Sequence, residues 1–178
     1  METIYIVGFH GVGKTMLGKV LASRKNLKFL DTDLAVSEKE GKELKDIINV
    51  HGIDYYNDLG KYIIKNSVEQ GMIVSVGATL VSDEENRHII KRSGRVIYLR
   101  ASADTIYRNL QKYYNSIPLF RGDLTVLSVE KHLSTYRPYY EELQNYAIDI
   151  DNKNLDVLLS EILAIYNYIN KVKSHIFI

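Results

Sequence analysis

The sequence predicts an α/β protein with a parallel β-sheet covered by helices. Five short runs rich in β-forming residues alternate with longer stretches that suit helices. Such alternation is typical of a parallel sheet whose strands are joined by helical crossovers. The chain has 178 residues, of which 46% are hydrophobic, and it contains neither a Gly/Ser-rich linker nor an internal repeat. We therefore expect one domain that spans residues 1–178.

The elements can be assigned in chain order. The expected strands are residues 3–7, 28–30, 72–76, 95–99 and 146–150. The clearest helix comes last, where an apolar stripe recurs at a spacing of three to four residues. Its members are Leu155, Leu158, Leu159, Ile162, Leu163 and Ile165. The tail at 171–178 fits either a frayed helix end or a packing strand.

Composition excludes several classes of protein. The 23 Lys and Arg residues against 22 Asp and Glu give a net charge of +1, so neither nucleic acid nor an anionic membrane is expected as the main partner. The absence of cysteine excludes disulfide scaffolds, thiolate zinc sites and cysteine nucleophiles. No segment approaches the roughly 18 apolar residues of a membrane helix, and the first residues lack the pattern of a signal peptide. We expect a cytoplasmic protein with no membrane partner.

A phosphate-binding loop follows the first expected strand. Residues 8–15 read Gly-Phe-His-Gly-Val-Gly-Lys-Thr and match the pattern G-x-x-x-x-G-K-[S/T] ahead of a helical pattern. Glycines let backbone N–H groups approach a phosphate chain, and the helix start adds the positive end of its dipole. Lys14 is expected at the β and γ phosphates and Thr15 at the bridging Mg²⁺. His10 is expected to point to solvent and has no assigned role.

Two aspartates end the second expected strand. Because strand side chains alternate, Asp31 and Asp33 project to the same side at the carboxyl edge of the sheet, where parallel sheets bind ligands. One carboxylate can hold the hydration shell of Mg²⁺ while the other accepts a proton from an acceptor hydroxyl. The alternative is that Asp33 caps the following helix while Asp31 is solvated.

Taken together, the motifs resemble the shikimate kinase family, small P-loop kinases that phosphorylate the 3-hydroxyl of shikimate with ATP. The resemblance extends from Ile4 to about Leu163. Besides the loop and the aspartates, it is carried by residues 41–48, Gly52, Gly77, 96–99, Arg108, 118–119, 136–140 and 149–154. It implies a three-layer αβα P-loop kinase fold with a five-stranded parallel sheet and a mobile lid at about 113–123.

The resemblance also implies roles for individual residues. Asp33 would polarise the acceptor hydroxyl, Arg137 would hold the acceptor carboxylate, and Gly77 and Asn57 would complete the acceptor site. Thr15 and Asp31 would hold Mg²⁺. The implied contacts of ATP are Gly11, Val12, Gly13, Lys14, Thr15, Met16, Arg108 and Lys153. Without the resemblance, Arg137 reads as a surface arginine and Arg108 as a partner of nearby acids.

Several positions depart from the family pattern. A second carboxylate-binding arginine falls on Asn57, and its glutamate partner falls near Gly60. A triple glycine reads 77–79 Gly-Ala-Thr, and the Arg-Pro-Leu of the lid reads 117–119 Ile-Pro-Leu. We expect Arg121 to replace the missing lid arginine as a catalytic residue if the lid closes in another register.

Three functions remain open at this point. The first is a monomeric kinase that transfers phosphate from ATP to shikimate with Mg²⁺. The second is a related kinase with another small acceptor, because the loss of a cation at Asn57 changes which anions the pocket favours. The third is a nucleotide-binding interaction protein whose paired tyrosines, such as those at 55–56 and 139–140, form a partner surface. Alternatively, the tyrosine rings pack at the edge of the core.

Overall fold

A computed structural model describes residues 2–113, 115, 117–120 and 124–174 of the chain. Its centre is a five-stranded sheet in the order β2-β3-β1-β4-β5, with every neighbouring pair parallel. The strands are β1 (Thr3–Val7), β2 (Phe29–Asp31), β3 (Ile73–Ser75), β4 (Gly94–Arg100) and β5 (Tyr146–Asp149). The α/β fold with a five-stranded parallel sheet is thus confirmed, and the strand bounds differ from those expected by at most a few residues.

The middle strand is buried on both faces. Ile4, Tyr5, Ile6 and Val7 are all 0% exposed. Tyr5 lies opposite Val74 of β3 on one side and Val96 of β4 on the other. A strand covered on both faces needs an unbroken apolar run instead of alternation, which explains the composition of this segment.

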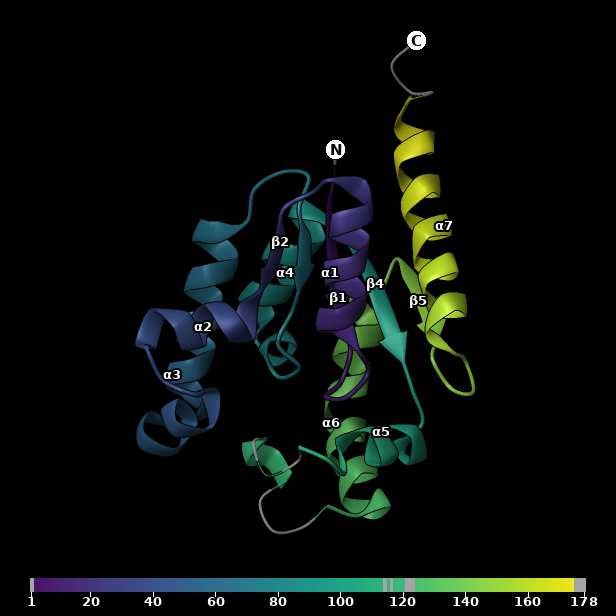
Figure 1. Ribbon diagram of the computed structural model, residues 1–178. Coiled ribbons are helices and arrows are strands. Elements are labelled where there is room, and N and C mark those ends of the chain that lie inside the picture. The colour runs from purple at the N-terminus through teal and green to yellow at the C-terminus, as the bar shows by residue number, and fades with distance from the viewer. Residues whose placement is uncertain (1, 114, 116, 121–123, 175–178) are drawn as a thin grey trace.

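Helices cover both faces of the sheet (Figure 1). On one face α1 (Lys14–Lys25) packs beside α7 (Leu155–Ser174). On the other, α4 (Glu84–Ser93) contacts both α6 (Val126–Leu143) and α3 (Leu44–Ser67). The remaining helices are α2 (Thr32–Glu40) and α5 (Ala103–Leu110), with short 3₁₀ turns at Leu80–Ser82 and Pro118–Phe120. None of the helices within the described residues is long and apolar enough to cross a membrane.

The last helix follows its predicted stripe only in part. Leu158, Leu159 and Ile162 are buried, whereas Leu155 is 41% exposed. The helix continues to Ser174, so the first residues of the 171–178 tail are helical and not a strand. Residues 175–178 lie outside the described part of the chain.

The long helix α3 contains a break. Gly52 has φ 87° and ψ 171°, so the helical geometry stops there and resumes beyond it. Positive φ is accessible to glycine at little cost, because it has no Cβ. The break divides α3 into a first part at 44–51 and a second part that begins at Ile53, and both contribute residues to the cleft described below.

Candidate active site

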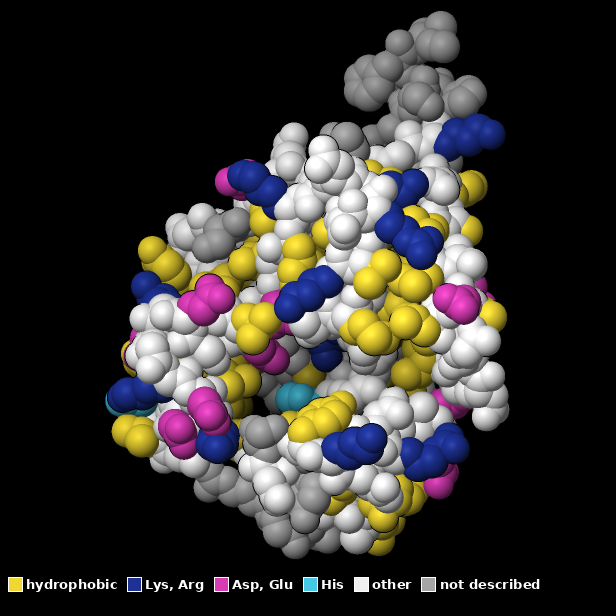
Figure 2. Space-filling view, viewed as in Figure 1, with side chains coloured by type: hydrophobic (Ala, Val, Ile, Leu, Met, Phe, Trp, Pro, Cys, Tyr) yellow, Lys and Arg dark blue, Asp and Glu magenta, His cyan; other side chains and the backbone are white. Residues whose placement is uncertain are grey.

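A cleft of about 1220 Å³ lies at the carboxyl edge of the sheet. Figure 2 shows it as a hollow between the α2–α3 side and the α5–α6 side of the molecule. Its walls come from the phosphate loop, α2, the connection from α2 to α3, α3 on both sides of Gly52 and the turn at Pro118–Phe120. The cleft therefore brings the predicted phosphate loop together with Asp33, whereas Asn57, Gly77 and Arg137 of the predicted acceptor site do not line it.

The loop between β1 and α1 is shaped by its glycines. Gly8 has φ 145°, and a Cβ there would lie 2.6 Å from the carbonyl oxygen of Leu99. Gly13 is the N-cap of α1 with φ 87° and no side-chain cap. The first N–H groups of α1 have no side-chain acceptor at the cap, which is the arrangement that binds phosphate at a helix start.

Lys14 is anchored inside this loop. Its Nζ donates to the carbonyl oxygens of Gly8 at 2.9 Å and Phe9 at 2.8 Å. Burial lowers the pKa of Lys14, and the carboxylates of Asp33 and Asp31 oppose that shift. The ammonium is thus held beside the loop amides, with two carboxylates near enough to favour its charge.

Asp31 performs two tasks with its two oxygens. Oδ1 accepts the N–H groups of Asp33 at 3.0 Å and Leu34 at 3.2 Å and so caps α2. Oδ2 accepts the hydroxyl of Thr15 at 2.6 Å. The alternative in which Asp33 caps the helix and Asp31 is solvated is wrong, because Asp31 is the cap and is only 8% exposed.

Asp33 is held by Tyr56, which the sequence analysis named only as one of a tyrosine pair and not as a site residue. The hydroxyl of Tyr56 donates to Oδ1 of Asp33 at 2.6 Å, and Tyr56 is 2% exposed. Burial raises the pKa of Asp33, whereas the hydrogen bond from Tyr56 lowers it. Gly77 touches both groups, since a Cβ there would collide with the Tyr56 hydroxyl and with Asp33.

The segment after β3 is fixed by hydrogen bonds. The N–H of Gly77 donates to Oγ1 of Thr32 at 2.8 Å, and the hydroxyl of Tyr140 donates to the carbonyl of Ala78 at 2.7 Å. Thr79 lines the cleft, whereas Ala78 is buried and does not. Of the two side chains that replace family glycines, only that of Thr79 borders the ligand space.

His10 does not behave as expected. It lines the cleft, and its ring lies edge-on to Phe9 with the centroids 5.2 Å apart. Burial, reinforced by the charge of Lys14, lowers the pKa of His10 to about 3. The expectation that His10 points to solvent is therefore wrong. A neutral imidazole borders the cleft next to the phosphate loop.

The lid is described only in part. Ile117, Pro118 and Leu119 line the cleft, and the buried Phe120 packs edge-on against Phe9 at 6.0 Å. Residues 114, 116 and 121–123 lie outside the described part of the chain. Arg121 belongs to them, so its catalytic role and the mobility of the lid stay predictions.

The predicted second anchor position is not part of the cleft wall. Asn57 does not line the cleft, and its buried Oδ1 has no hydrogen-bond partner among the described residues. A Cβ at Gly60 would collide with the side chain of Leu80. Leu80 thus occupies the space that the family's glutamate would need.

Although position 57 supplies no cation, two lysines border the cleft. Lys42 and Lys45 both line it, and Nζ of Lys45 pairs with Glu43 at 2.8 Å. Lys45 stands three residues before Ile48 in α3, so both share the face that meets the cleft. That spacing is the signal in the sequence that could have identified Lys45.

Two of the three predicted arginines, Arg108 and Arg137, lie outside the lining of the cleft. Arg137 pairs with Glu130 at 3.1 Å. The exposed Arg108 donates to the hydroxyl of Thr105 at 3.1 Å. Its neighbour Asn109 donates to the carbonyl of Gly11 at 2.8 Å, which ties α5 to the phosphate loop.

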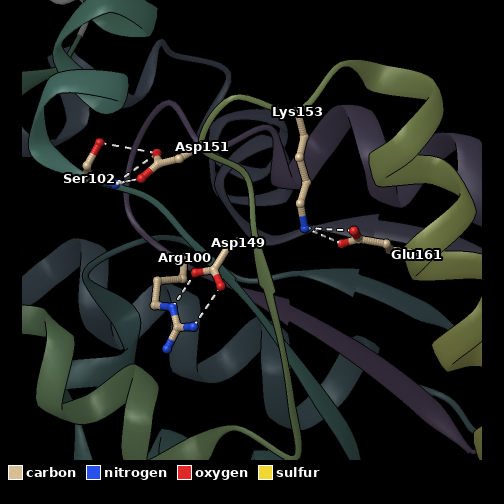
Figure 3. Close-up of polar contacts among 6 residues, drawn as sticks. All are labelled: Arg100, Ser102, Asp149, Asp151, Lys153 and Glu161. Atoms are coloured by element: carbon tan, nitrogen blue, oxygen red, sulfur yellow. Dashed lines mark hydrogen bonds and ion pairs between the residues drawn. The ribbon is translucent and has the colours of Figure 1, made fainter.

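A network of polar contacts orders the loop between β5 and α7 (Figure 3). Lys153 binds both carboxylate oxygens of Glu161, at 2.7 and 2.8 Å. Asp149 accepts from Arg100, with 2.8 Å between Nη2 and Oδ2. Asp151 accepts the N–H of Ser102 at 3.1 Å, just before α5. Lys153 is therefore engaged by α7 and does not line the cleft.

The sequence places this chain among known proteins. A sequence model described as shikimate kinase matches residues 10–167. A shikimate kinase of Sulfurihydrogenibium sp. (strain YO3AOP1) is 35% identical over 92% of this chain and 97% of its own length. One from Alkaliphilus oremlandii (strain OhILAs) is 32% identical over 92% of this chain and 98% of its own.

A solved structure agrees in fold. The shikimate kinase of Acinetobacter baumannii, solved in complex with shikimate, superposes with a TM-score of 0.88 at 22% identity and covers 94% of each chain. At that identity the likeness shows the fold, while the sequence relatives carry the assignment. The chain belongs to the shikimate kinase family and is an ATP-dependent phosphotransferase that acts on a hydroxyl group.

Proposed function

We propose that this protein transfers the γ-phosphoryl group of ATP to the 3-hydroxyl of shikimate. The observation that carries the proposal is the convergence of Lys14, Thr15 and Asp33 on one cleft. Phosphoryl transfer needs positioning and charge stabilisation more than covalent help from the protein, so a cationic loop facing a carboxylate is a sufficient core.

The donor side supplies fixed positive charge. The N–H groups at the start of α1 and the ammonium of Lys14 would bind the β and γ phosphates. Thr15 and Asp31 present two hard oxygen donors 2.6 Å apart, which fits a Mg²⁺ that keeps waters and phosphate oxygens as its other ligands. When bound, Mg²⁺ would neutralise charge on the phosphate oxygens.

The acceptor side supplies a base. Asp33 would hold the acceptor hydroxyl and take its proton as the hydroxyl oxygen bonds to the γ-phosphorus. The bond between that phosphorus and the β–γ bridging oxygen breaks, and ADP leaves with the bonding electrons. Arg108 and Lys153 would join the nucleotide site after a side-chain rearrangement, Lys153 by leaving Glu161.

The acceptor carboxylate needs a cation, and we assign this role first to Lys45. Its pair with Glu43 is exposed, with 39% of the Lys45 side chain and 69% of the Glu43 side chain accessible. Such pairs contribute little, about 0–1 kcal/mol, so an incoming carboxylate can compete for the lysine. Arg137 would serve as the second cation once it exchanges Glu130 for the substrate.

A second candidate function is transfer to another small acceptor. It is favoured by Asn57, because this position carries an arginine in the family, whereas here it carries an uncharged side chain that does not line the cleft. The interaction-protein hypothesis is weakened because Tyr56 and Tyr140 are buried, with their hydroxyls bonded inside the fold. We further propose a monomer, since a single chain supplies both walls of the cleft. Membership of the shikimate kinase family supports a cytoplasmic location.

The test is an acceptor screen that measures ADP release. Purified protein receives ATP and Mg²⁺ with shikimate, quinate, gluconate or a nucleoside monophosphate, and the Asp33→Asn variant serves as the background control. We expect shikimate to give the highest kcat/KM. A faster reaction with another acceptor would replace shikimate by that molecule, and no release above background with any acceptor would reject the kinase assignment.

A further inference from the structure

The hydroxyl of Tyr56 lies beside Asp33 at the wall of the cleft. Tyr56 belongs to the second half of α3, beyond the break at Gly52, and its side chain is buried yet borders the cleft. The hydroxyl donates to Oδ1 of Asp33 at 2.6 Å. A phenol is neutral and donates one hydrogen bond, so it can orient a carboxylate without cancelling its charge.

This contact fixes the orientation of Asp33. A carboxylate on a short side chain turns freely about its last torsion unless one oxygen is bound. Oδ1 is occupied by Tyr56, while Oδ2 has no hydrogen bond or ion pair from any residue that the structure describes. One oxygen of Asp33 is therefore held, and the other is left to a ligand in the cleft.

The segment after β3 packs against the Tyr56–Asp33 pair. A Cβ at Gly77 would collide with both the Tyr56 hydroxyl and Asp33. The backbone of this segment is held by its bonds to Thr32 and Tyr140. The pair joins α2 to α3 and packs directly against Gly77, so any side chain at position 77 would displace it.

We propose that Tyr56 is a positioning residue for phosphoryl transfer, which fixes Asp33 so that Oδ2 receives the acceptor hydroxyl. This inference rests on the proposed function, because it requires Asp33 to contact the acceptor. The reacting oxygen must lie close to the base in a defined direction, and a misplaced base costs rate more than binding. The role of Tyr56 is therefore in turnover and not in ATP affinity.

The first test is Tyr56→Phe, which removes only the hydroxyl. We expect kcat to fall by about tenfold, the size typical of losing one charge-assisted hydrogen bond in a site, with the KM for ATP unchanged within about twofold. The matched control is Tyr55→Phe on the same helix, which removes a hydroxyl outside the cleft lining and should leave kcat unchanged. An unchanged kcat in Tyr56→Phe would overturn the proposal.

A double-mutant cycle separates positioning from general damage. If Tyr56 acts through Asp33, Tyr56→Phe in an Asp33→Asn background should change kcat by less than about twofold. A full additional tenfold loss there would show that the hydroxyl acts elsewhere. The two failures are distinguishable: wild-type protein inactive with shikimate rejects the proposed function, whereas an active wild type insensitive to Tyr56→Phe rejects this inference alone. If another acceptor proves faster, the cycle is run with that acceptor.

The hydrogen bond itself can be observed without turnover. A short, protected O–H···O⁻ bond should give a downfield hydroxyl proton resonance in the NMR spectrum of the ligand-free protein. We expect this signal to disappear in Tyr56→Phe, persist in Tyr55→Phe and move upfield in Asp33→Asn, because an amide oxygen is a weaker acceptor. A signal that survives Tyr56→Phe, or none in the wild type, would contradict the contact.

Discussion

The two sides of the cleft are built from different materials. The phosphate side consists of one continuous loop of backbone amides and glycines, with Lys14 bound to the loop's own carbonyls. The acceptor side is assembled from side chains of α2, α3, α6 and the turn at Pro118–Phe120. A site made of backbone restricts which amino acids can occupy a few consecutive positions. A site made of side chains from distant elements can change by substitution of one residue at a time. Accordingly, the positions at which this chain departs from the family pattern lie on the acceptor side.

The largest expected effect is on the phosphate side. Lys14→Ala should lower kcat/KM by roughly a thousandfold, because the charge that stabilises the transferring phosphoryl group is lost. The thermal midpoint should change little, since Lys14 bonds loop carbonyls among the described residues and is absent from the apolar core. Lys19→Ala is the control, because Lys19 is exposed on the same helix. Retained turnover with an unchanged melt would refute the role of Lys14.

The next effect lies at the junction of the two sides. Asp33→Asn should lower kcat by about a hundredfold or more, the usual contribution of a general base, and should leave the KM for ATP nearly unchanged. Steady-state kinetics with varied ATP check this split. Equal losses in kcat and in ATP affinity would instead assign Asp33 to the metal and nucleotide.

A smaller effect tests the acceptor side. Lys45→Ala should raise the KM for shikimate about tenfold, since one charge-assisted contact to the carboxylate disappears. Lys39→Ala removes an equal charge from exposed surface near Tyr62 and should have no effect. Asn57→Arg should change the KM less than about threefold, because Leu80 fills the space beside Gly60. A large gain from Asn57→Arg together with no loss from Lys45→Ala would return the anchor to position 57.

The smallest effect concerns His10 and stability. The pKa of His10 is about 3 in the folded chain against 6.5 ordinarily, so below pH 6.5 the unfolded chain binds a proton that the folded chain does not. Stability should fall as the pH drops from 6.5 towards 3, by at most about 1.4 kcal/mol per pH unit from this group. Urea unfolding at pH 7, 6 and 5 should show a shallower decline in His10→Asn than in the wild type. Parallel slopes would contradict the burial of a neutral imidazole.

The phosphate side could be predicted from the sequence more fully than the acceptor side. The phosphate loop and the five strands were predictable, because their signals lie within consecutive residues. The contact between Tyr56 and Asp33 joins residues 23 apart on two helices, and no local pattern reports it. Arg137 and Glu130 both lie on α6, seven residues apart, so their pairing follows a helical spacing that the sequence analysis did not use. The pairing of Lys153 with Glu161 joins a loop to α7 and depends on how that loop folds, so it was out of reach. His10 was misjudged because its ring packs edge-on against Phe9 and borders the cleft, which no local pattern reports.

The break at Gly52 has a thermodynamic consequence for how the acceptor enters. A continuous helix opens cooperatively, since each backbone hydrogen bond supports the next. With that ladder interrupted, the half of α3 that carries Lys45 and Ile48 can open locally at a lower free energy than the half that carries Tyr56. Amide hydrogen exchange should therefore be faster at 45–51 than at 56–64. The cleft can then admit its ligand while the group that orients the base stays folded.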